Sequence, residues 1–185
     1  MKIYRIHITA LLLIVQYGNA QQSNSDKKEI LHIIDTYTKN VIERDSVGFY
    51  NLFNDEAVVW CGAITDRSQQ RLIAQKGIKK AGSNYFTGGY KNFMRSLFKY
   101  KTTEDKFYNI KIVEDGTVAA VTMDYSFWAN NKMTNWGSKY LALIKRDGKW
   151  KITSVIYSLE LISYFEQPSI NTRKKEKKRN YKIRQ

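Results

Sequence analysis

The chain has 185 residues, one cysteine, two histidines and a formal net charge of +14. This length favours a single folded domain, and an apolar content of 43% with 14% aromatic residues excludes global disorder. A lone cysteine excludes a disulfide framework and a cysteine-cluster zinc site, and two histidines exclude most histidine-based metal sites, so we expect neither metal nor cofactor.

Residues 1–20 have the pattern of a secretory signal peptide. Lys2 and Arg5 give a positive start, residues 8–15 are apolar, and small residues precede a cleavage site before Gln21. The apolar run is shorter than the roughly 18 residues that span a bilayer. We therefore expect a secreted or periplasmic protein with no transmembrane span after cleavage.

Helical spacing dominates the first half of the remaining chain. Residues 27–44 repeat apolar side chains at helical intervals, and His32 lies opposite that stripe, so we expect it to face solvent. Further elements are expected at 45–53 (helix), 57–61 (strand), 67–80 (helix) and 90–98 (helix).

From residue 107 the apolar period changes to two, which is typical of strands. Asp-Gly and Asn-Asn pairs separate the apolar runs, and both pairs suit tight hairpins. We expect strands at 107–113, 117–128, 135–146 and 150–158. Helices followed by an antiparallel meander predict an α+β fold.

The chain ends in a basic tail, residues 167–185, after a folded domain of residues 27–166. Pro168, the only proline, marks the boundary, and residues 173–185 carry +7 of the formal +14 charge. The tail is either a solvated, disordered end or a contact for anionic surfaces. A secreted address disfavours a specific nucleic acid as partner.

Two segments carry a resemblance to a known family. The run Asp45-Ser-Val-Gly-Phe-Tyr-Asn-Leu-Phe-Asn-Asp-Glu-Ala-Val-Val-Trp60 resembles the helix-to-strand segment of nuclear transport factor 2-like, SnoaL-like domains. The run Gly148-Lys-Trp-Lys-Ile-Thr-Ser-Val-Ile-Tyr-Ser158 resembles their last strand. The resemblance covers roughly residues 27–160. It implies a single domain in which a curved antiparallel sheet wraps around N-terminal helices as a cone with a pocket, commonly in a dimer.

That family contains enzymes, binding proteins and inert scaffolds, so the fold does not fix a reaction. Several of its enzymes carry a pocket His–Asp pair, or a histidine two residues before the closing serine of the last strand. Here the latter position is Ile156. We therefore do not expect a histidine-dependent mechanism.

If the hairpin loops have two or four residues, the pairing between neighbouring strands follows from the residue numbers. The side chains of the sheet can then be assigned to its two faces. One face collects Thr122, Asp124, Ser126, Trp128, Leu141, Leu143, Trp150, Ile152 and Ile156. The other collects Val121, Met123, Tyr125, Phe127, Trp136, Tyr140, Val155 and Tyr157. Neither face is polar, so we expect both to be covered. We assign the first to the core and pocket, and the second to a homodimer interface formed by Tyr125, Phe127, Trp136, Tyr140 and Tyr157.

The candidate ligand-binding residues are Trp60, Asp124, Ser126 and Trp128. Asp124 is also the candidate catalytic residue, because burial in an apolar pocket raises a carboxyl pKa and suits proton transfer. The alternative places Asp124 in an ion pair with a lysine, or hydrated at the mouth of the cone. Trp60 lines the pocket or belongs to the core.

Two functions remain. The first is a non-catalytic dimer that binds a small hydrophobic ligand or acts as a scaffold, and the lack of a pocket histidine favours it. The second is a small-molecule isomerase or dehydratase that uses a pocket carboxylate for proton transfer.

Overall fold

The computed structural model describes residues 25–169 and 172–173. The expected signal peptide and almost all of the expected tail charge lie outside these residues. The elements are an N-terminal helix (25–43), α2 (Ser46–Tyr50), β1 (Val59–Ile64), α3 (Asp66–Lys76), α4 (Ile78–Ala81), β2 (Tyr85–Thr87), α5 (Tyr90–Leu97), β3 (Thr103–Glu114), β4 (Val118–Ala129), β5 (Lys132–Arg146) and β6 (Lys149–Leu161).

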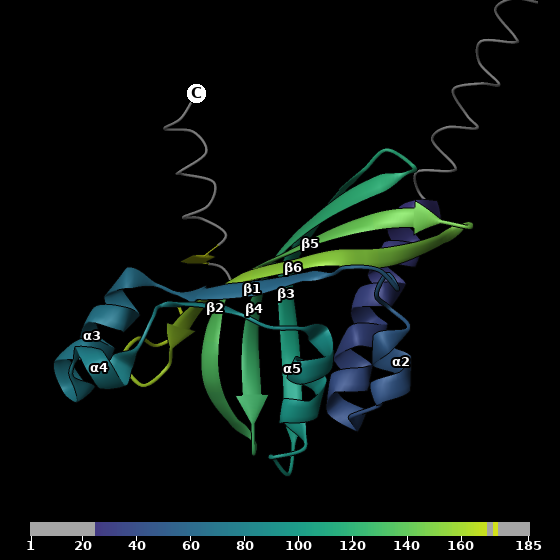
Figure 1. Cartoon of the computed structure of the whole chain (residues 1–185). Coiled ribbons are helices and arrows are strands. Elements are labelled where there is room, and N and C mark those ends of the chain that lie inside the picture. The colour runs from purple at the N-terminus through teal and green to yellow at the C-terminus, as the bar shows by residue number, and fades with distance from the viewer. Residues whose placement is uncertain (1–24, 170–171, 174–185) are drawn as a thin grey trace, which may run out of the picture.

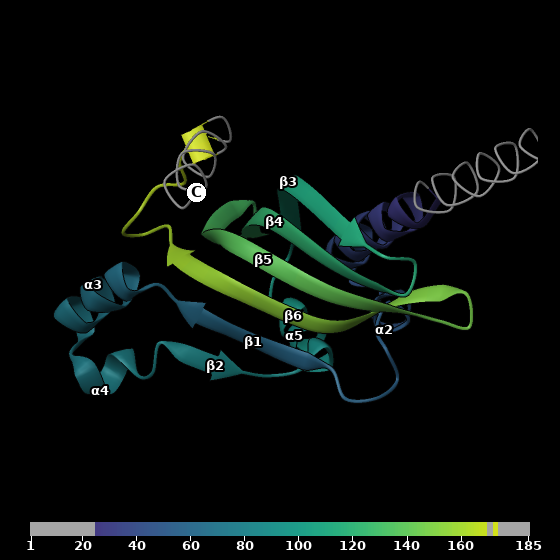
Figure 2. The ribbon, with the colours of Figure 1, turned by 90° about the horizontal axis from the view of Figure 1, so that it is seen from above.

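All strands belong to one curved sheet with the order β2-β1-β6-β5-β4-β3 (Figures 1 and 2). Strands β3 to β6 form the antiparallel meander that the sequence predicts. Strand β1 differs from the expectation, because it pairs with β6 in parallel and with the short β2 in antiparallel direction. The sheet is therefore mixed, and the α+β class is confirmed.

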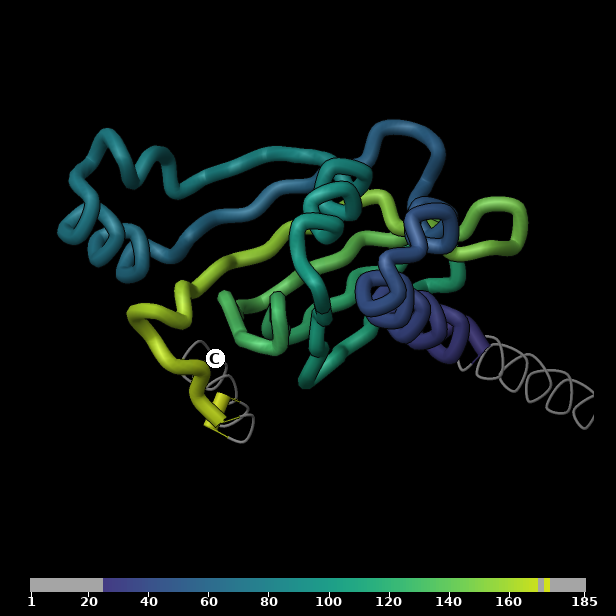
Figure 3. The backbone as a smooth tube through the Cα atoms, turned by 90° about the horizontal axis from the view of Figure 1, so that it is seen from below, coloured from purple at the N-terminus to yellow at the C-terminus, as the bar shows by residue number. Residues whose placement is uncertain are grey.

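The N-terminal helix, α2 and α5 lie against one face of the sheet, which we call the inner face, while α3 and α4 lie beyond the end of β1 (Figures 1 and 3). The apolar stripe of the N-terminal helix is buried there as predicted. His32 is exposed, also as predicted. No helix among the described residues is long and apolar enough to cross a membrane.

The predicted helix at 67–80 is interrupted. It separates into α3 and α4 at Gly77, which has a φ of 77° that favours glycine. The chain then returns along β1 as β2, a strand that the sequence reading did not predict. Strand β3 begins at Thr103, four residues before the expected start.

Irregularities in the strand pairing decide which side chains meet the helices, and one occurs in each of the β3–β4, β4–β5 and β5–β6 pairings. Phe127 pairs with Asn135, but Trp128 pairs with Met133, so β5 contains one extra residue near its start. A second irregularity lies where β5 pairs with β6, between Ala142 and Leu143. A shift of one residue moves every following side chain to the opposite face of the sheet.

The predicted division into faces is therefore corrected. Leu141 pairs with Val121 and Val155, and all three lie on the inner face. Tyr140 pairs with Thr122 and Ile156 on the other side, which we call the outer face. The assignment from the sequence assumed strand pairing without extra residues, and the extra residue in β5 and the shift between β5 and β6 break that assumption.

Candidate functional site

The inner face carries a buried ion pair. Lys139 on β5 donates from Nζ to Asp105 Oδ2 on β3 at 2.7 Å, and their side chains are only 4% and 1% exposed. The Lys139 Nζ also lies 3.5 Å from the Tyr37 hydroxyl on the N-terminal helix. This polar cluster thus links two strands with the helix that covers them.

Aromatic rings surround the Lys139 ammonium. Its Nζ lies 4.6 Å from the ring centroid of Tyr125, 5.0 Å from that of Phe107 and 5.2 Å from that of Tyr37. The negative faces of such rings attract a cation and offset part of the cost of its dehydration. The aromatic content that suggested a dimer interface thus lies largely within the domain.

Burial shifts the pKa values of this cluster in opposite directions. Burial lowers the pKa of the Lys139 ammonium, while the Asp105 carboxylate acts against that shift. Burial, together with the nearby Asp105, raises the pKa values of Tyr37 and Tyr125 well above the ordinary value. Burial also raises the pKa of Tyr157 to about 12.

A cleft of about 260 Å³ lies between the N-terminal helix and β3 and reaches Asp105. Its lining residues are Ile34, Asp35, Thr38, Glu104, Asp105, Lys106, Phe107 and Ile110. The Oδ1 atom of Asp105 is buried and has no hydrogen-bond partner among the described residues. A buried acceptor without a partner costs about 1–3 kcal/mol, which a donor group placed in the cleft would recover.

Trp60 lies on the inner face but not at this cleft. It pairs with Val155 along the parallel β1–β6 ladder and packs against Phe53, Phe93 and Tyr157. Its environment is the core, which is the second of the two readings that the sequence allowed.

Asp124 lies on the outer face, so it does not share a pocket with Trp60. Arg173 contacts its carboxylate at 3.1 Å, and the Asn109 side chain donates to it at 2.8 Å. The Arg173 guanidinium also donates to the Gly137 carbonyl at 2.9 Å. Asp124 is thus in an ion pair, and its partner is an arginine that the sequence assigned to the basic tail.

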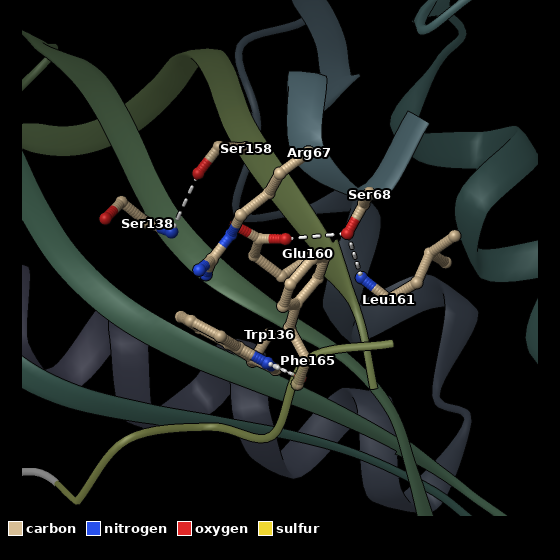
Figure 4. A network of polar contacts seen from close by, with 8 residues as sticks. All are labelled: Arg67, Ser68, Trp136, Ser138, Ser158, Glu160, Leu161 and Phe165. Carbon is tan, nitrogen blue, oxygen red and sulfur yellow. Dashed lines mark hydrogen bonds and ion pairs between the residues drawn. The ribbon is translucent and has the colours of Figure 1, made fainter. Parts of the chain in front are cut away.

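A second polar network holds the same end of the outer face (Figure 4). Glu160 accepts from Arg67 Nε at 2.6 Å and from Ser68 Oγ at 2.6 Å. The Trp136 indole donates to the Phe165 carbonyl at 2.8 Å, so the segment after β6 crosses over this ring. Trp136 is thereby covered by the chain itself.

The remaining ligand-binding and interface residues predicted from the sequence also lie on different faces of the sheet. Ser126 and Trp128 lie on the outer face, where the Trp128 indole donates to Ser126 Oγ at 3.0 Å. Tyr125 and Phe127 lie on the inner face. Among the expected interface residues, Tyr140 is the one that combines the outer face with large exposure, at 48%.

Lys139 and Asp105 were not among the residues predicted from the sequence. A lysine two residues before Leu141 on the same strand is the signal that could have found the pair, because an inward-facing lysine needs a buried partner. That signal depends on knowing which parity faces inward, and the irregular hairpin hides it. Within residues 25–169 and 172–173, no three His, Cys, Asp or Glu side chains are grouped as a metal site would need.

No family model matches the sequence, and no curated protein matches it. Solved structures are similar in fold. A nuclear transport factor 2-like protein of unknown function from Pseudomonas putida has a TM-score of 0.53 at 13% identity, over 73% of this chain and 87% of its own. A putative scytalone dehydratase from Novosphingobium aromaticivorans has a TM-score of 0.56 at 13% identity, over 82% and 95%.

A hexachlorocyclohexane dehydrochlorinase from Novosphingobium barchaimii has a TM-score of 0.55 at 11% identity, over 76% of this chain and 90% of its own. At these identities the likeness is one of fold alone. The fold that the sequence resemblance implied is confirmed.

The tyrosine cluster predicts a loss of stability in alkali. Because the folded-state pKa values of Tyr37, Tyr125 and Tyr157 are raised, their contribution is complete below about pH 10 and is lost as the pH rises toward about 12. The contribution of Lys139 to the pH dependence has the opposite sign. Because its pKa is lowered in the folded state, the free energy of unfolding rises with pH below about pH 10. Above that pH the three phenols outweigh it.

Urea unfolding at a series of alkaline pH values measures this slope. Tyr157→Phe removes one of the phenols, and we expect the slope to decrease by up to about 1.4 kcal/mol per pH unit. A slope that is unchanged in Tyr157→Phe would contradict the assignment of a raised pKa to this residue.

Proposed function

We propose that this chain, which has the nuclear transport factor 2-like fold, is a secreted or periplasmic homodimer that binds a small ligand without transforming it. The observation that carries the proposal is the buried Oδ1 atom of Asp105, which has no partner among the described residues and belongs to a side chain that lines the 260 Å³ cleft. The ligand is a small apolar molecule with one N–H or O–H donor.

The lining of the cleft suits both the apolar body and the single donor group of this ligand. Ile34, Phe107 and Ile110 supply apolar walls for the body of the ligand. The free lone pairs of Asp105 Oδ1 accept a hydrogen bond, and Lys139 already balances the carboxylate charge from the other oxygen. A neutral donor therefore satisfies the site without adding an uncompensated charge.

Proton transfer by a pocket carboxylate is the second candidate, because Asp105 does lie inside the cone. The Lys139 ammonium already occupies one oxygen of this carboxylate, at 2.7 Å. His32 is exposed and does not line this cleft. Binding is therefore better supported than catalysis, and conversion of a bound ligand into product would favour the second candidate.

Matched ligands test the role of Asp105. We expect 2-phenylethanol to bind and ethylbenzene, which has the same body without the donor, to bind at least about tenfold more weakly. In Asp105→Asn the Lys139 ammonium holds the amide oxygen, so the amide nitrogen faces the cleft and acetophenone, an acceptor, becomes the preferred ligand. Chemical-shift titration measures all three affinities.

Asp55→Asn is the control, because Asp55 is exposed and distant in sequence from the cleft. It should leave the order of the three ligands unchanged. Equal affinities of wild-type protein for 2-phenylethanol and ethylbenzene would exclude Asp105 as the anchor, whatever the variants do.

The outer face supports the homodimer. Its part away from Arg173 carries exposed apolar side chains on neighbouring strands, namely Val59, Val113, Val118, Tyr140, Ile144 and Ile156. Contiguous exposed apolar surface of this kind is typical of a protein interface.

Tyr140→Asp tests this interface, because a charge buried there without a partner costs several kcal/mol. We expect sedimentation to show a wild-type dimer at micromolar concentration and a monomer or aggregate for Tyr140→Asp. Ile78→Asp is the control, since Ile78 is 72% exposed on α4 and away from this surface, and it should remain dimeric. A wild-type monomer would contradict the proposal.

The secreted or periplasmic address rests on the sequence of residues 1–20, and a mature chain that begins at Gln21 is the expected result of N-terminal sequencing. The basic tail is proposed to contact anionic surfaces. Because Arg173 is buried, a tail deletion should begin at Lys174. Elution from heparin at the same salt concentration with and without residues 174–185 would contradict a role of the tail.

A further inference from the structure

A second hollow, with a volume of about 430 Å³, adjoins the Asp105 cleft, because Glu104 and Lys106 line both. Its lining residues are Ile42, Thr102, Thr103, Glu104, Lys106, Trp128 and Asn131. They come from the end of the N-terminal helix, the start of β3 and the β4–β5 hairpin, which meet at the lower end of the molecule in Figure 1. Trp128 is the one aromatic residue among them.

The Trp128 ring is held in place by its neighbours. Its Nε1 donates to the buried Ser126 Oγ at 3.0 Å, and that hydroxyl contacts the Tyr108 hydroxyl at 3.2 Å. Lys106 Nζ lies 4.5 Å from the ring centroid. The other three tryptophans, Trp60, Trp136 and Trp150, are buried, so Trp128 is the tryptophan that offers part of its ring to a ligand.

The polar rim of the hollow is rigid as well. Asn131 Oδ1 accepts from the Thr102 hydroxyl at 3.0 Å, and that hydroxyl accepts from the Asn131 backbone N–H at 3.1 Å. Asn130 accepts from the Lys101 N–H at 2.7 Å through its side chain. The β4–β5 hairpin is therefore hydrogen-bonded to the residues directly before β3. The polar groups that would contact a ligand are thus held in place before it binds.

We propose that this hollow binds the pyranose ring of a neutral oligosaccharide. A pyranose has an apolar C–H face, which fits against the indole of Trp128 and the side chain of Ile42, and a rim of hydroxyl groups. Those hydroxyls need both donors and acceptors, which the Asn131 amide and the Lys106–Glu104 ion pair at 3.3 Å supply together.

The charge of the hollow selects against other ligand classes. Lys106 and Glu104 compensate each other, so the site offers no net charge to an anion or a cation. A purely apolar ligand would use Trp128 and Ile42 but would dehydrate the ion pair and the amide without replacing their hydrogen bonds. A neutral polyhydroxylated ring satisfies both surfaces.

Titration with maltohexaose, cellohexaose and chitohexaose tests the proposal, because these three neutral probes differ in linkage and in the substituent at C2. We expect at least one to bind with a change in tryptophan fluorescence and a calorimetric signal. Trp128→Ala should weaken that binding about tenfold or more, and Trp128→Tyr should retain part of it. Ser126→Ala should weaken it less, because it frees the indole without removing it.

Tyr85→Ala is the matched control, since Tyr85 is an exposed aromatic residue on β2 and should leave saccharide binding unchanged. Two results would overturn the proposal. One is that none of the three hexasaccharides binds at millimolar concentration, and the other is that Trp128→Ala binds them as wild-type protein does.

Discussion

The buried ion pair between Lys139 and Asp105 is the interaction on which the inner face depends. It joins β5 to β3 across β4 and lies beneath Tyr37 of the N-terminal helix. Removing one partner of such a pair typically costs about 3–5 kcal/mol, because the other charge stays buried without compensation. The rings that surround the ammonium belong to the strands and to the helix, so the pair also fixes how the helix lies on the sheet.

The pair lies beside one of the two surfaces that the proposed ligand and partner would use, and other contacts organise the second. Lys139 engages one oxygen of Asp105, and the other oxygen is buried without a hydrogen-bond partner among the described residues, in a side chain that lines the cleft. On the opposite side of the sheet, Arg173 and the segment after β6 close over Asp124 and Trp136. The apolar part of that outer face stays exposed. Contacts within the chain thus cover one part of the outer face, and the other part stays open to a partner.

Much of the fold was predictable from the sequence, because helical spacing and Asp-Gly or Asn-Asn turns are local signals. The stripe that begins at Ile30 and the β3–β6 meander both follow from them. The site was not predictable, because it depends on one extra residue in the hairpin that follows Trp128. That residue exchanges the faces of β5 and moves Lys139 inward, and no local spacing rule reports it. Likewise, Arg173 belongs to a charge run that resembles a solvated tail.

A double-mutant cycle on the ion pair tests this account most directly. Urea unfolding would compare Lys139→Met, Asp105→Asn and the double variant with wild-type protein. We expect Lys139→Met to cost about 3 kcal/mol or more, and the double variant to cost clearly less than the sum of the two single variants, because neither then leaves a buried charge unpaired. Single-variant costs below about 1 kcal/mol that simply add would contradict a structure organised around this pair.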